Sequence, residues 1–278
     1  MESGINFFNL YRAASLNPVF HYQLQTGMLK PGDPADFIIA DSLDPFHVTA
    51  TFIDGISVFA EDKVEALLPD VELMNAFHAE TIQPSDLEVK GEPGLFKVIR
   101  AWDGELVTGS ETAQLTASEG VIMGDVKRDI LKIVVLNRYI KGKPAVAWIA
   151  GFGMKKGAMA SSIAHDSHNI IAVGTSDEEI SDAINQIILH KGGISVTVAG
   201  ECKTLPLPVA GLMSTGTADE VGLKYAELSS MARNLGSELK APFMALSFMA
   251  LLVIPHLKLG DRGLFDCDKF QFTTLTAD

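Results

Sequence analysis

The sequence predicts a mixed α/β or α+β fold, and two observations lead to this prediction. Residues 170–173 are a continuous apolar run of strand length, and a capping-box helix and then an alternating strand at 194–198 follow them. In the first part of the chain, Asp54-Gly55 separates two short apolar segments. This pair is typical of a β-hairpin, because both central turn residues need positive φ. We find no internal repeat, and 278 residues suffice for one large or two ordinary domains.

Composition and charge narrow the classes of function. Hydrophobic residues make up 47% of the chain, which is enough for a sizeable core. The formal net charge of −13 argues against nucleic acids and anionic membranes as partners, since both would repel the protein. The longest apolar run, residues 243–254, is shorter than the roughly 20 residues that span a bilayer, so we expect a buried core helix there.

Cysteine usage and the first residues indicate the compartment. The chain contains two cysteines, Cys202 and Cys267, which are too few for a disulfide framework or a four-cysteine zinc site. Residues 1–6 lack the basic and apolar regions of a signal peptide. We therefore expect a cytoplasmic protein that acts on neutral or cationic small molecules.

Local patterns predict the individual elements. A helix is predicted over residues 5–24, with a break where Asn17 caps a restart at Pro18. Capping boxes predict further helices after Ser176 and Thr217. The helix after Ser176 lies between two strand patterns, which favours a right-handed crossover between parallel strands. Strands are predicted at residues 37–41, 48–53, 56–60, 96–101, 106–108, 131–138, 145–150, 170–173 and 194–198.

The densest group of polar side chains lies directly before the apolar run at residues 170–173. Three of them are candidate catalytic residues: His165, Asp166 and His168. Polar clusters of this kind occur at functional sites and also in turns whose backbone groups they satisfy, so a structural turn is the alternative. Four more side chains are candidates to bind substrate or to complete a site: Ser161, Ser162, Ser167 and Asn169.

Three specific chemistries can be weighed against a structural turn. A metal site formed by His165, His168 and Asp166 would need a local turn, because strand residues three apart face opposite sides; we assign no metal ligand. A Ser–His–Asp hydrolase is disfavoured, because triad members normally come from separate elements and no Gly-x-Ser-x-Gly motif is present. The glycine-rich segment 151–157 lacks the spacing of a dinucleotide or phosphate loop, and we expect a tight turn there.

Two sets of motifs resemble known families. The first set resembles the end of an amidohydrolase-superfamily chain and consists of residues 13–18, Gly27, Pro31-Gly32, Ala35-Asp36 and Asp54-Gly55. The second set resembles the C-terminal domain of bacterial adenine deaminase and keeps the order of that family. It consists of residues 151–174, 205–213, 242–244, 246–248, 253–255 and 258–259.

The resemblance implies a fold and a reaction. Residues 1–62 would be the last helix of a metal-dependent (β/α)₈ barrel plus strands of a small β domain. Residues 63–94 would be a connector, and residues 95–278 a sandwich-like adenine deaminase C-terminal domain. The reaction would be the hydrolytic deamination of adenine to hypoxanthine and ammonia, in adenine catabolism and purine salvage. In that chemistry a hydroxide bound to Mn or Fe attacks C6 of the purine.

The sequence departs from the family at the metal centre. The metal ligands of the barrel should begin with a His-x-His pair, and none of the seven histidines forms one. We therefore expect the ligand-bearing strands to lie upstream or on a separate barrel chain, and the metal not to be held by this chain alone. The polar cluster would then complete a site built elsewhere, in a homo-oligomer that uses adenine as substrate. The alternative is a non-catalytic remnant that acts as a structural or interaction domain.

Overall fold

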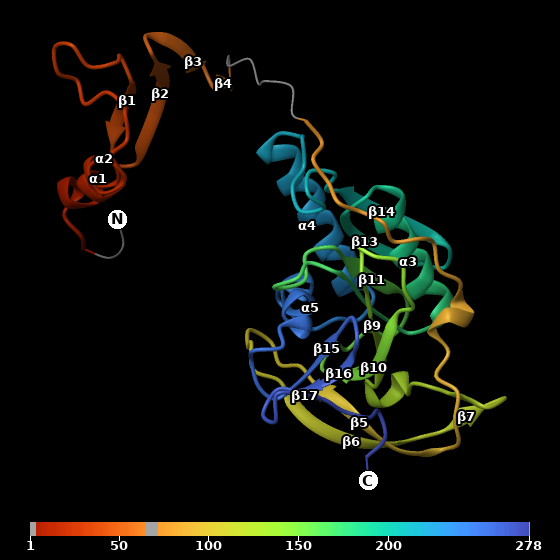
Figure 1. The fold of residues 1–278 in the computed structure, drawn as a ribbon. Helices are drawn as coiled ribbons and strands as arrows, with labels where there is room; N and C mark the ends of the chain where they lie inside the picture. The colour runs from red at the N-terminus through yellow and green to blue at the C-terminus, as the bar shows by residue number, and fades with distance from the viewer. Residues whose placement is uncertain (1–3, 65–71, 278) are drawn as a thin grey trace. The chain divides into compact units, whose positions relative to one another are not determined.

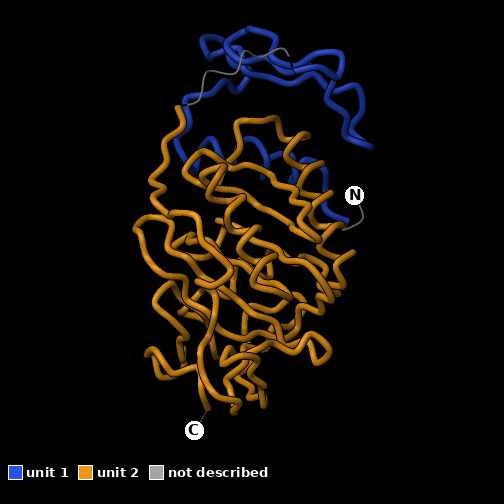
Figure 2. The backbone as a smooth tube through the Cα atoms, turned by 90° about the vertical axis from the view of Figure 1, so that its right-hand side faces the viewer, with its two compact units in different colours: residues 1–70 blue, residues 71–278 orange. Residues whose placement is uncertain are grey.

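The computed structural model describes residues 4–64 and 72–277, and the chain folds into two compact units, residues 1–70 and 71–278 (Figures 1 and 2). The first unit contains two short helices and a four-stranded antiparallel sheet in the order β1-β2-β3-β4. Its elements are α1 (Phe7–Ala14), α2 (Leu16–Tyr22), β1 (Phe37–Leu43), β2 (Phe46–Ile53), β3 (Ile56–Ala60) and β4 (Lys63–Val64).

Backbone hydrogen bonding sets the two main turns of the first unit. The break between α1 and α2 falls at Ser15, two residues before the predicted cap at Asn17. The carbonyl of Tyr11 accepts both the N–H of Ser15, at 3.0 Å, and its hydroxyl, at 2.6 Å. This double contact ends α1 earlier than the sequence predicts. Asp54-Gly55 joins β2 to β3, and both residues have positive φ.

The second unit is built on an eight-stranded mixed sheet in the order β14-β13-β11-β12-β9-β10-β5-β6. Neighbouring strands are antiparallel except β10 and β5, which are parallel. The predicted mixed α and β class is therefore confirmed, with a large sheet and few helices. The elements are η1 (Pro84–Leu87), β5 (Gly94–Arg100), β6 (Gly109–Leu115), β7 (Ala117–Ser118), β8 (Val121–Ile122), η2 (Val126–Arg128), β9 (Leu131–Leu136), β10 (Ala145–Ala150), β11 (Ala158–Ser161), β12 (Ile170–Gly174), α3 (Asp177–Leu189), β13 (Gly193–Val198), β14 (Glu201–Pro206), α4 (Ala218–Asn234), α5 (Pro242–Ser247), η3 (Phe248–Ala250), β15 (Leu257–Gly260), β16 (Gly263–Asp266) and β17 (Gln271–Phe272).

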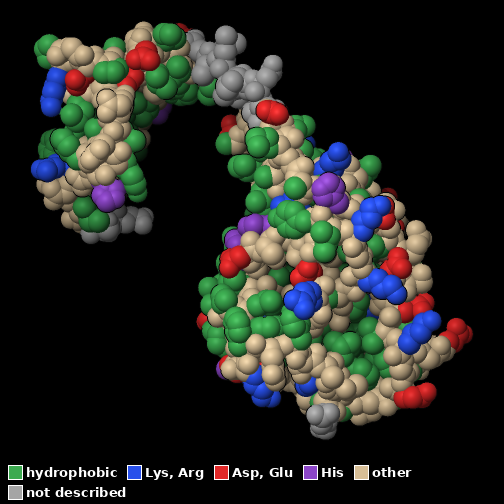
Figure 3. Space-filling view, in the orientation of Figure 1, with side chains coloured by type: hydrophobic (Ala, Val, Ile, Leu, Met, Phe, Trp, Pro, Cys, Tyr) green, Lys and Arg blue, Asp and Glu red, His purple; other side chains and the backbone are tan. Residues whose placement is uncertain are grey.

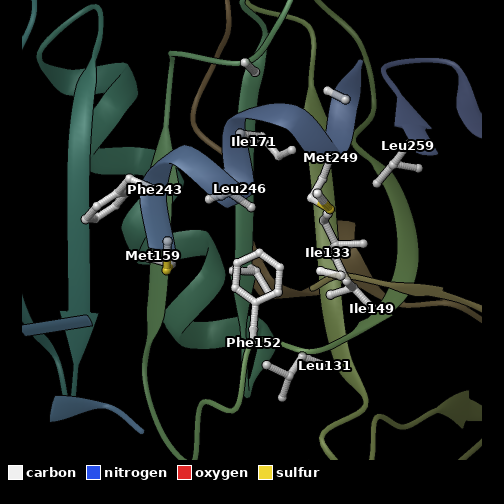
Figure 4. Close-up of a cluster of buried hydrophobic side chains, with 14 of the residues drawn as sticks. Leu131, Ile133, Ile149, Phe152, Met159, Ile171, Phe243, Leu246, Met249 and Leu259 are labelled. Carbon is white, nitrogen blue, oxygen red and sulfur yellow. The ribbon is translucent and has the colours of Figure 1, made fainter. Parts of the chain in front are cut away.

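Both faces of the central strands are buried, which explains their continuous apolar sequences. On β12, Ile171 and Val173 belong to a cluster that includes residues of α4, α5 and β15. Ile170 and Ala172 belong to a cluster with α3 on the opposite face. Figure 4 shows the first cluster, with side chains of α5 and η3 packed over the sheet. The sheet therefore forms the middle layer of the second unit.

The two strands of the unit β12-α3-β13 are not adjacent in the sheet. β11 lies between β12 and β13 and is antiparallel to both, so that Ala160 is opposite Ala172 on one side and Ser195 on the other. β12 and β13 therefore run parallel, as the crossover predicts, but they are not hydrogen-bonded neighbours. The crossover through α3 skips one strand, because β11 already occupies the position beside β12.

The predicted helix over residues 243–254 is shorter than expected. It consists of α5 and η3, and η3 ends at Ala250. The hydroxyl of Ser247 donates to the carbonyl of Met244 at 2.7 Å, a local contact that competes with regular helical bonding. Among the described residues, no helix has the length and apolar character needed to cross a membrane.

Two other segments differ from the expected pattern. Residues 106–108 form no strand, because the N–H of Thr108 donates to the carbonyl of Pro255 rather than to a strand neighbour. The described part of the predicted connector, residues 72–94, lies in the second unit, where Leu87 is fully buried. Residues 65–71 of that connector lie outside the described residues.

Candidate functional site

The polar cluster forms the loop of residues 162–169, which joins the adjacent strands β11 and β12 near the centre of the large sheet. Backbone contacts hold both histidines of this loop. The N–H of His165 donates to the carbonyl of Ser247 at 2.9 Å, and the N–H of His168 donates to that of Ala164 at 2.6 Å. The loop therefore lies against the end of α5, which anchors it to the helical layer.

The hydroxyls of the first two serines of the cluster, Ser161 and Ser162, form hydrogen bonds with backbone groups. The hydroxyl of Ser161 accepts the N–H of Ile163 at 2.9 Å. The hydroxyl of Ser162 accepts the N–H of Gly193 at 2.8 Å and donates to the carbonyl of Gly211 at 2.6 Å. Both serines are buried, so these bonds favour a structural role for them over contact with a substrate.

Aromatic contacts bring His165 and His168 together. Their ring centroids lie 5.3 Å apart at 65°, and the other neighbour of His165 is Phe248, whose ring is stacked at 4.7 Å. Nδ1 of His168 is enclosed and makes no hydrogen bond to a described residue. Burial lowers the pKa of His168, and the nearby His165 and Arg138 lower it further against the opposing effect of Asp166. This environment therefore favours the neutral form of the His168 imidazole.

The other polar residues of the loop differ in exposure and in hydrogen bonding. Asp166 is exposed, and no ion pair or hydrogen bond joins its carboxylate to a described side chain. The amide oxygen of Asn169, which is buried, accepts the N–H of Arg138 at 3.3 Å, and its nitrogen lies 3.4 Å from the hydroxyl of Ser167. The carbonyl of Ser167 accepts the hydroxyl of Tyr139 at 2.9 Å.

The divalent metal implied by the family resemblance does not fit the described residues. No group of three or more His, Cys, Asp or Glu side chains in residues 4–64 and 72–277 could hold a metal ion. His165 and His168 lie together, but Asp166 does not join them as a third ligand. Three hollows of about 120, 140 and 240 Å³ in the second unit are lined by none of the loop residues either.

Arg138 is a residue that sequence reasoning missed. It lies two residues after the end of β9 and is 3% exposed. Its Nε donates to the carbonyl of His168 at 2.6 Å, and Nη2 donates to the hydroxyl of Tyr139 at 2.8 Å. A charged residue just after the apolar run 133–136 is the signal that could have identified it, because lone charges are seldom buried.

Lys258 is a second residue that was missed. It is fully buried, and its Nζ donates to the carbonyls of Leu106 at 2.7 Å and Phe248 at 3.1 Å. Burial lowers the pKa of Lys258 to about 8, although the nearby Cys267 acts in the opposite direction. Lys258 therefore holds the backbone of the residue on which His165 stacks. Its position between two leucines in an alternating strand was the available signal.

The glycine-rich segment 151–157 binds carboxylates of the protein itself. The N–H groups of Gly151 and Gly153 donate to the Asp129 carboxylate at 2.6 and 2.7 Å, and the N–H of Gly157 donates to Glu179 at 2.7 Å. A Cβ at Gly151 would lie 2.0 Å from the Ala101 carbonyl oxygen, so the backbone approach requires glycine. These contacts agree with the predicted tight turn.

Comparisons with known proteins place the chain among relatives of similar sequence. The family model of the adenine deaminase C-terminal domain matches residues 105–271. The adenine deaminase of Methanosarcina barkeri is 49% identical over 99% of this chain and 52% of its own length. Those of Salinibacter ruber and Borreliella afzelii are 44% and 38% identical over 100% and 97% of this chain, and over 51% and 50% of their own lengths. The chain thus spans about half the length of these curated relatives.

Proposed function

Since the chain belongs to the adenine deaminase family, we propose that it contributes to the hydrolytic deamination of adenine to hypoxanthine and ammonia. The observation that carries this proposal is the match of residues 105–271 to the C-terminal domain of that family. The matched region includes the loop 162–169 with its paired imidazoles. The named relatives match over nearly the whole chain, which supports the same assignment for residues 1–70.

In this proposal the metal centre is formed by residues other than the described ones, because these provide no ligand group. Mn or Fe would be held by a (β/α)₈ barrel of the amidohydrolase type, present on the same polypeptide or on a separate chain. Residues 1–62 would contribute the last barrel helix and strands of a small β domain, for which the helices and antiparallel sheet of the first unit give support. The assembly would be a cytoplasmic homo-oligomer.

The loop 162–169 would complete the active site. A neutral imidazole can accept a proton from an attacking water and, once protonated, pass it to a leaving amine. Burial lowers the pKa of His168 and so favours the neutral form that accepts the proton. His165 is held against it by stacking on Phe248. Exposed Asp166 lies between the two histidines in sequence and can reach a ligand without breaking a contact.

A hybrid enzyme tests the proposal. This chain replaces the corresponding half of the Methanosarcina barkeri relative, and the hybrid and the chain alone are assayed for adenine turnover with Mn²⁺ or Fe²⁺. We expect turnover by the hybrid and none by the chain alone. A folded, metal-loaded hybrid without turnover would contradict the proposal and favour a non-catalytic role. Turnover by the chain alone would contradict the expected location of the metal centre.

Single substitutions in the hybrid test the loop. His168→Ala is expected to lower kcat at least about 100-fold, the usual range for loss of an acid–base group. His190→Ala is the matched control, because this histidine caps the end of α3 outside the loop. Unchanged kinetics with lowered stability in His165→Ala and His168→Ala would favour a structural turn.

A further inference from the structure

Arg138 is a buried cation whose acceptors are all uncharged. Besides the His168 carbonyl and the Tyr139 hydroxyl, its Nη1 donates to the side-chain oxygen of Asn75 at 3.2 Å. Its guanidinium carbon also lies 4.4 Å from the centroid of the Tyr139 ring. Burial of a charge is costly unless its donors are satisfied, so three oxygens from three segments fix this side chain in one orientation.

The guanidinium packs closely against the backbone of Gly211. A Cβ on Gly211 would lie 2.3 Å from Nη1, so the glycine backbone directly contacts the group. The carbonyl of Gly211 is itself held by the Ser162 hydroxyl at 2.6 Å. Arg138 therefore contacts the loop 162–169 directly at His168 and indirectly through Gly211.

The segment that supplies Asn75 crosses the second unit as a strap, which we define as residues 72–82 (orange in Figure 1). The amide nitrogen of Asn75 donates to the carbonyls of Lys191 at 2.6 Å and Pro208 at 3.1 Å. The carbonyl of Arg138 accepts the N–H of His78 at 2.7 Å. Asn75 thus joins the strap to the turn after α3, to the segment after β14 and to the Arg138 guanidinium.

We propose that Arg138 is a positioning residue for the His165–His168 pair. We further propose that Asn75 links the position of the strap to the position of this pair, because both contact the Arg138 guanidinium. Asn75 fixes one end of the guanidinium, and Nε at the other side holds the His168 carbonyl. Loss of either contact should make the loop 162–169, which carries both imidazoles, more mobile. A role of the histidine pair in adenine deamination rests on the proposed function. The positioning of the pair by Arg138 does not depend on it.

Amide hydrogen exchange in the whole chain tests the positioning, with the N–H groups of His165 and His168 as probes, since both are hydrogen-bonded within this region. Arg138→Met removes a charge-assisted bond to the loop and should speed their exchange about tenfold or more. Arg138→Lys should do the same, because an ammonium cannot replace three donors in a planar fork.

Asn75→Ala tests the coupling and should speed exchange of the same amides about threefold, as expected for one lost neutral bond. Its matched control is Asn185→Ala. Asn185 holds the same strap through both backbone groups of Ile82, at 2.9 and 3.0 Å, but it makes no hydrogen bond to Arg138. Equal exchange in the two asparagine variants would overturn the coupling, and unchanged exchange in both Arg138 variants would overturn the positioning.

Activity in the hybrid enzyme separates this inference from the proposed function. Arg138→Met should lower kcat about 10- to 100-fold with a smaller change in KM, because small displacements of acid–base groups slow the reaction itself. Asn185→Ala should leave both constants within about twofold. An unaltered kcat in an active hybrid carrying Arg138→Met would overturn the functional part of the inference. An inactive unsubstituted hybrid would count against the proposed function only, since the exchange results would still decide the positioning.

Discussion

The imidazole of His165 stacks on the ring of Phe248, with centroids 4.7 Å apart and planes inclined at 22°. The carbonyl of Phe248 accepts Nζ of Lys258 at 3.1 Å, and the carbonyl of the preceding Ser247 accepts the N–H of His165 at 2.9 Å. The stack is therefore held from both sides by hydrogen bonds. The junction of α5 and η3 provides the surface on which the loop 162–169 rests.

Phe248→Leu should lower the free energy of unfolding by about 1 kcal/mol. Leucine keeps most of the apolar area but loses the ring stacking, which contributes about 0.5–1.5 kcal/mol beyond area burial. Urea denaturation measures the change. Phe270→Leu is the control, because this ring is 69% exposed and contacts Phe265 edge-on. A loss as large in Phe270→Leu would show that stacking on His165 is not the cause.

Lys258 and Cys267 should make stability depend on pH in opposite directions. Burial lowers the pKa of Lys258 from 10.5 to about 8, so the unfolded chain binds more protons between these values and stability rises with pH. Burial raises the pKa of the Cys267 thiol from 9.0 to about 11, so the folded chain binds more protons there and stability falls with pH. The two effects oppose each other above about pH 9.

The Cys267→Ser background should expose the contribution of Lys258. Between pH 7.5 and 10.5, Cys267→Ser should gain about 2 kcal/mol of unfolding free energy relative to the double variant that also carries Lys258→Met. This figure is below the full value of the pKa change, because solvent screens part of the charge. Parallel stability curves for the two proteins across this pH range would rule out a neutral Lys258 above pH 8.

The buried Lys132–Asp177 pair should matter more than an exposed pair. Nζ of Lys132 lies 2.5 and 2.7 Å from the two carboxylate oxygens and also donates to the Leu87 carbonyl at 2.9 Å. Burial raises the pKa of Asp177 against the effect of Lys132. Lys132→Met leaves a half-buried carboxylate without its partner and should cost about 2 kcal/mol in urea denaturation, less than for a fully buried pair.

Lys141→Met is the matched control for Lys132→Met. Lys141 pairs with Glu80, and both side chains are mostly exposed. Its loss should cost less than about 1 kcal/mol. Similar losses in the two variants would mean that burial does not determine the strength of these pairs.

The sequence predicts those elements of the second unit that short local motifs specify, such as the capped start of α3. Ser176 caps α3 by accepting the N–H of Glu179, as its capping box predicts. The Glu179 carboxylate does not return to the cap, and instead accepts the N–H groups of Gly157 and Ala199 and the Thr175 hydroxyl. These partners come from loops that only the folded sheet brings near, so a four-residue motif could not reveal them.

For the candidate site, too, the sequence predicts the local grouping of residues but not their long-range contacts. The spacing of His165 and His168 places them in one short loop, and the structure brings their rings together. Arg138 lies 30 residues from His168 in sequence, and Asn75 lies 63 residues from Arg138. The position of β11 between β12 and β13 is likewise a long-range outcome, because pairing order depends on packing of the whole sheet.

The first unit should not fold cooperatively by itself. None of its described residues, 4–64, is fully buried. Figure 3 shows apolar side chains over much of its visible face. A peptide of residues 1–64 should therefore show no sigmoidal thermal transition by circular dichroism, because it buries too little apolar surface to offset the entropy of folding. Within residues 4–64, the large apolar side chains exposed by 67% or more are Phe8, Phe20, Tyr22, Leu29, Ile56 and Val64.

Residues 72–278 are the control for this experiment and should unfold in one sharp transition, since three clusters of buried residues lie within them. Addition of the half of the Methanosarcina barkeri relative that this chain does not match should protect the amides of β1 to β3 from exchange, if that half covers the apolar surface. A sharp, reversible transition of the 1–64 peptide alone would contradict this prediction. It would make the first unit an independent domain and remove one support for its place beside a barrel.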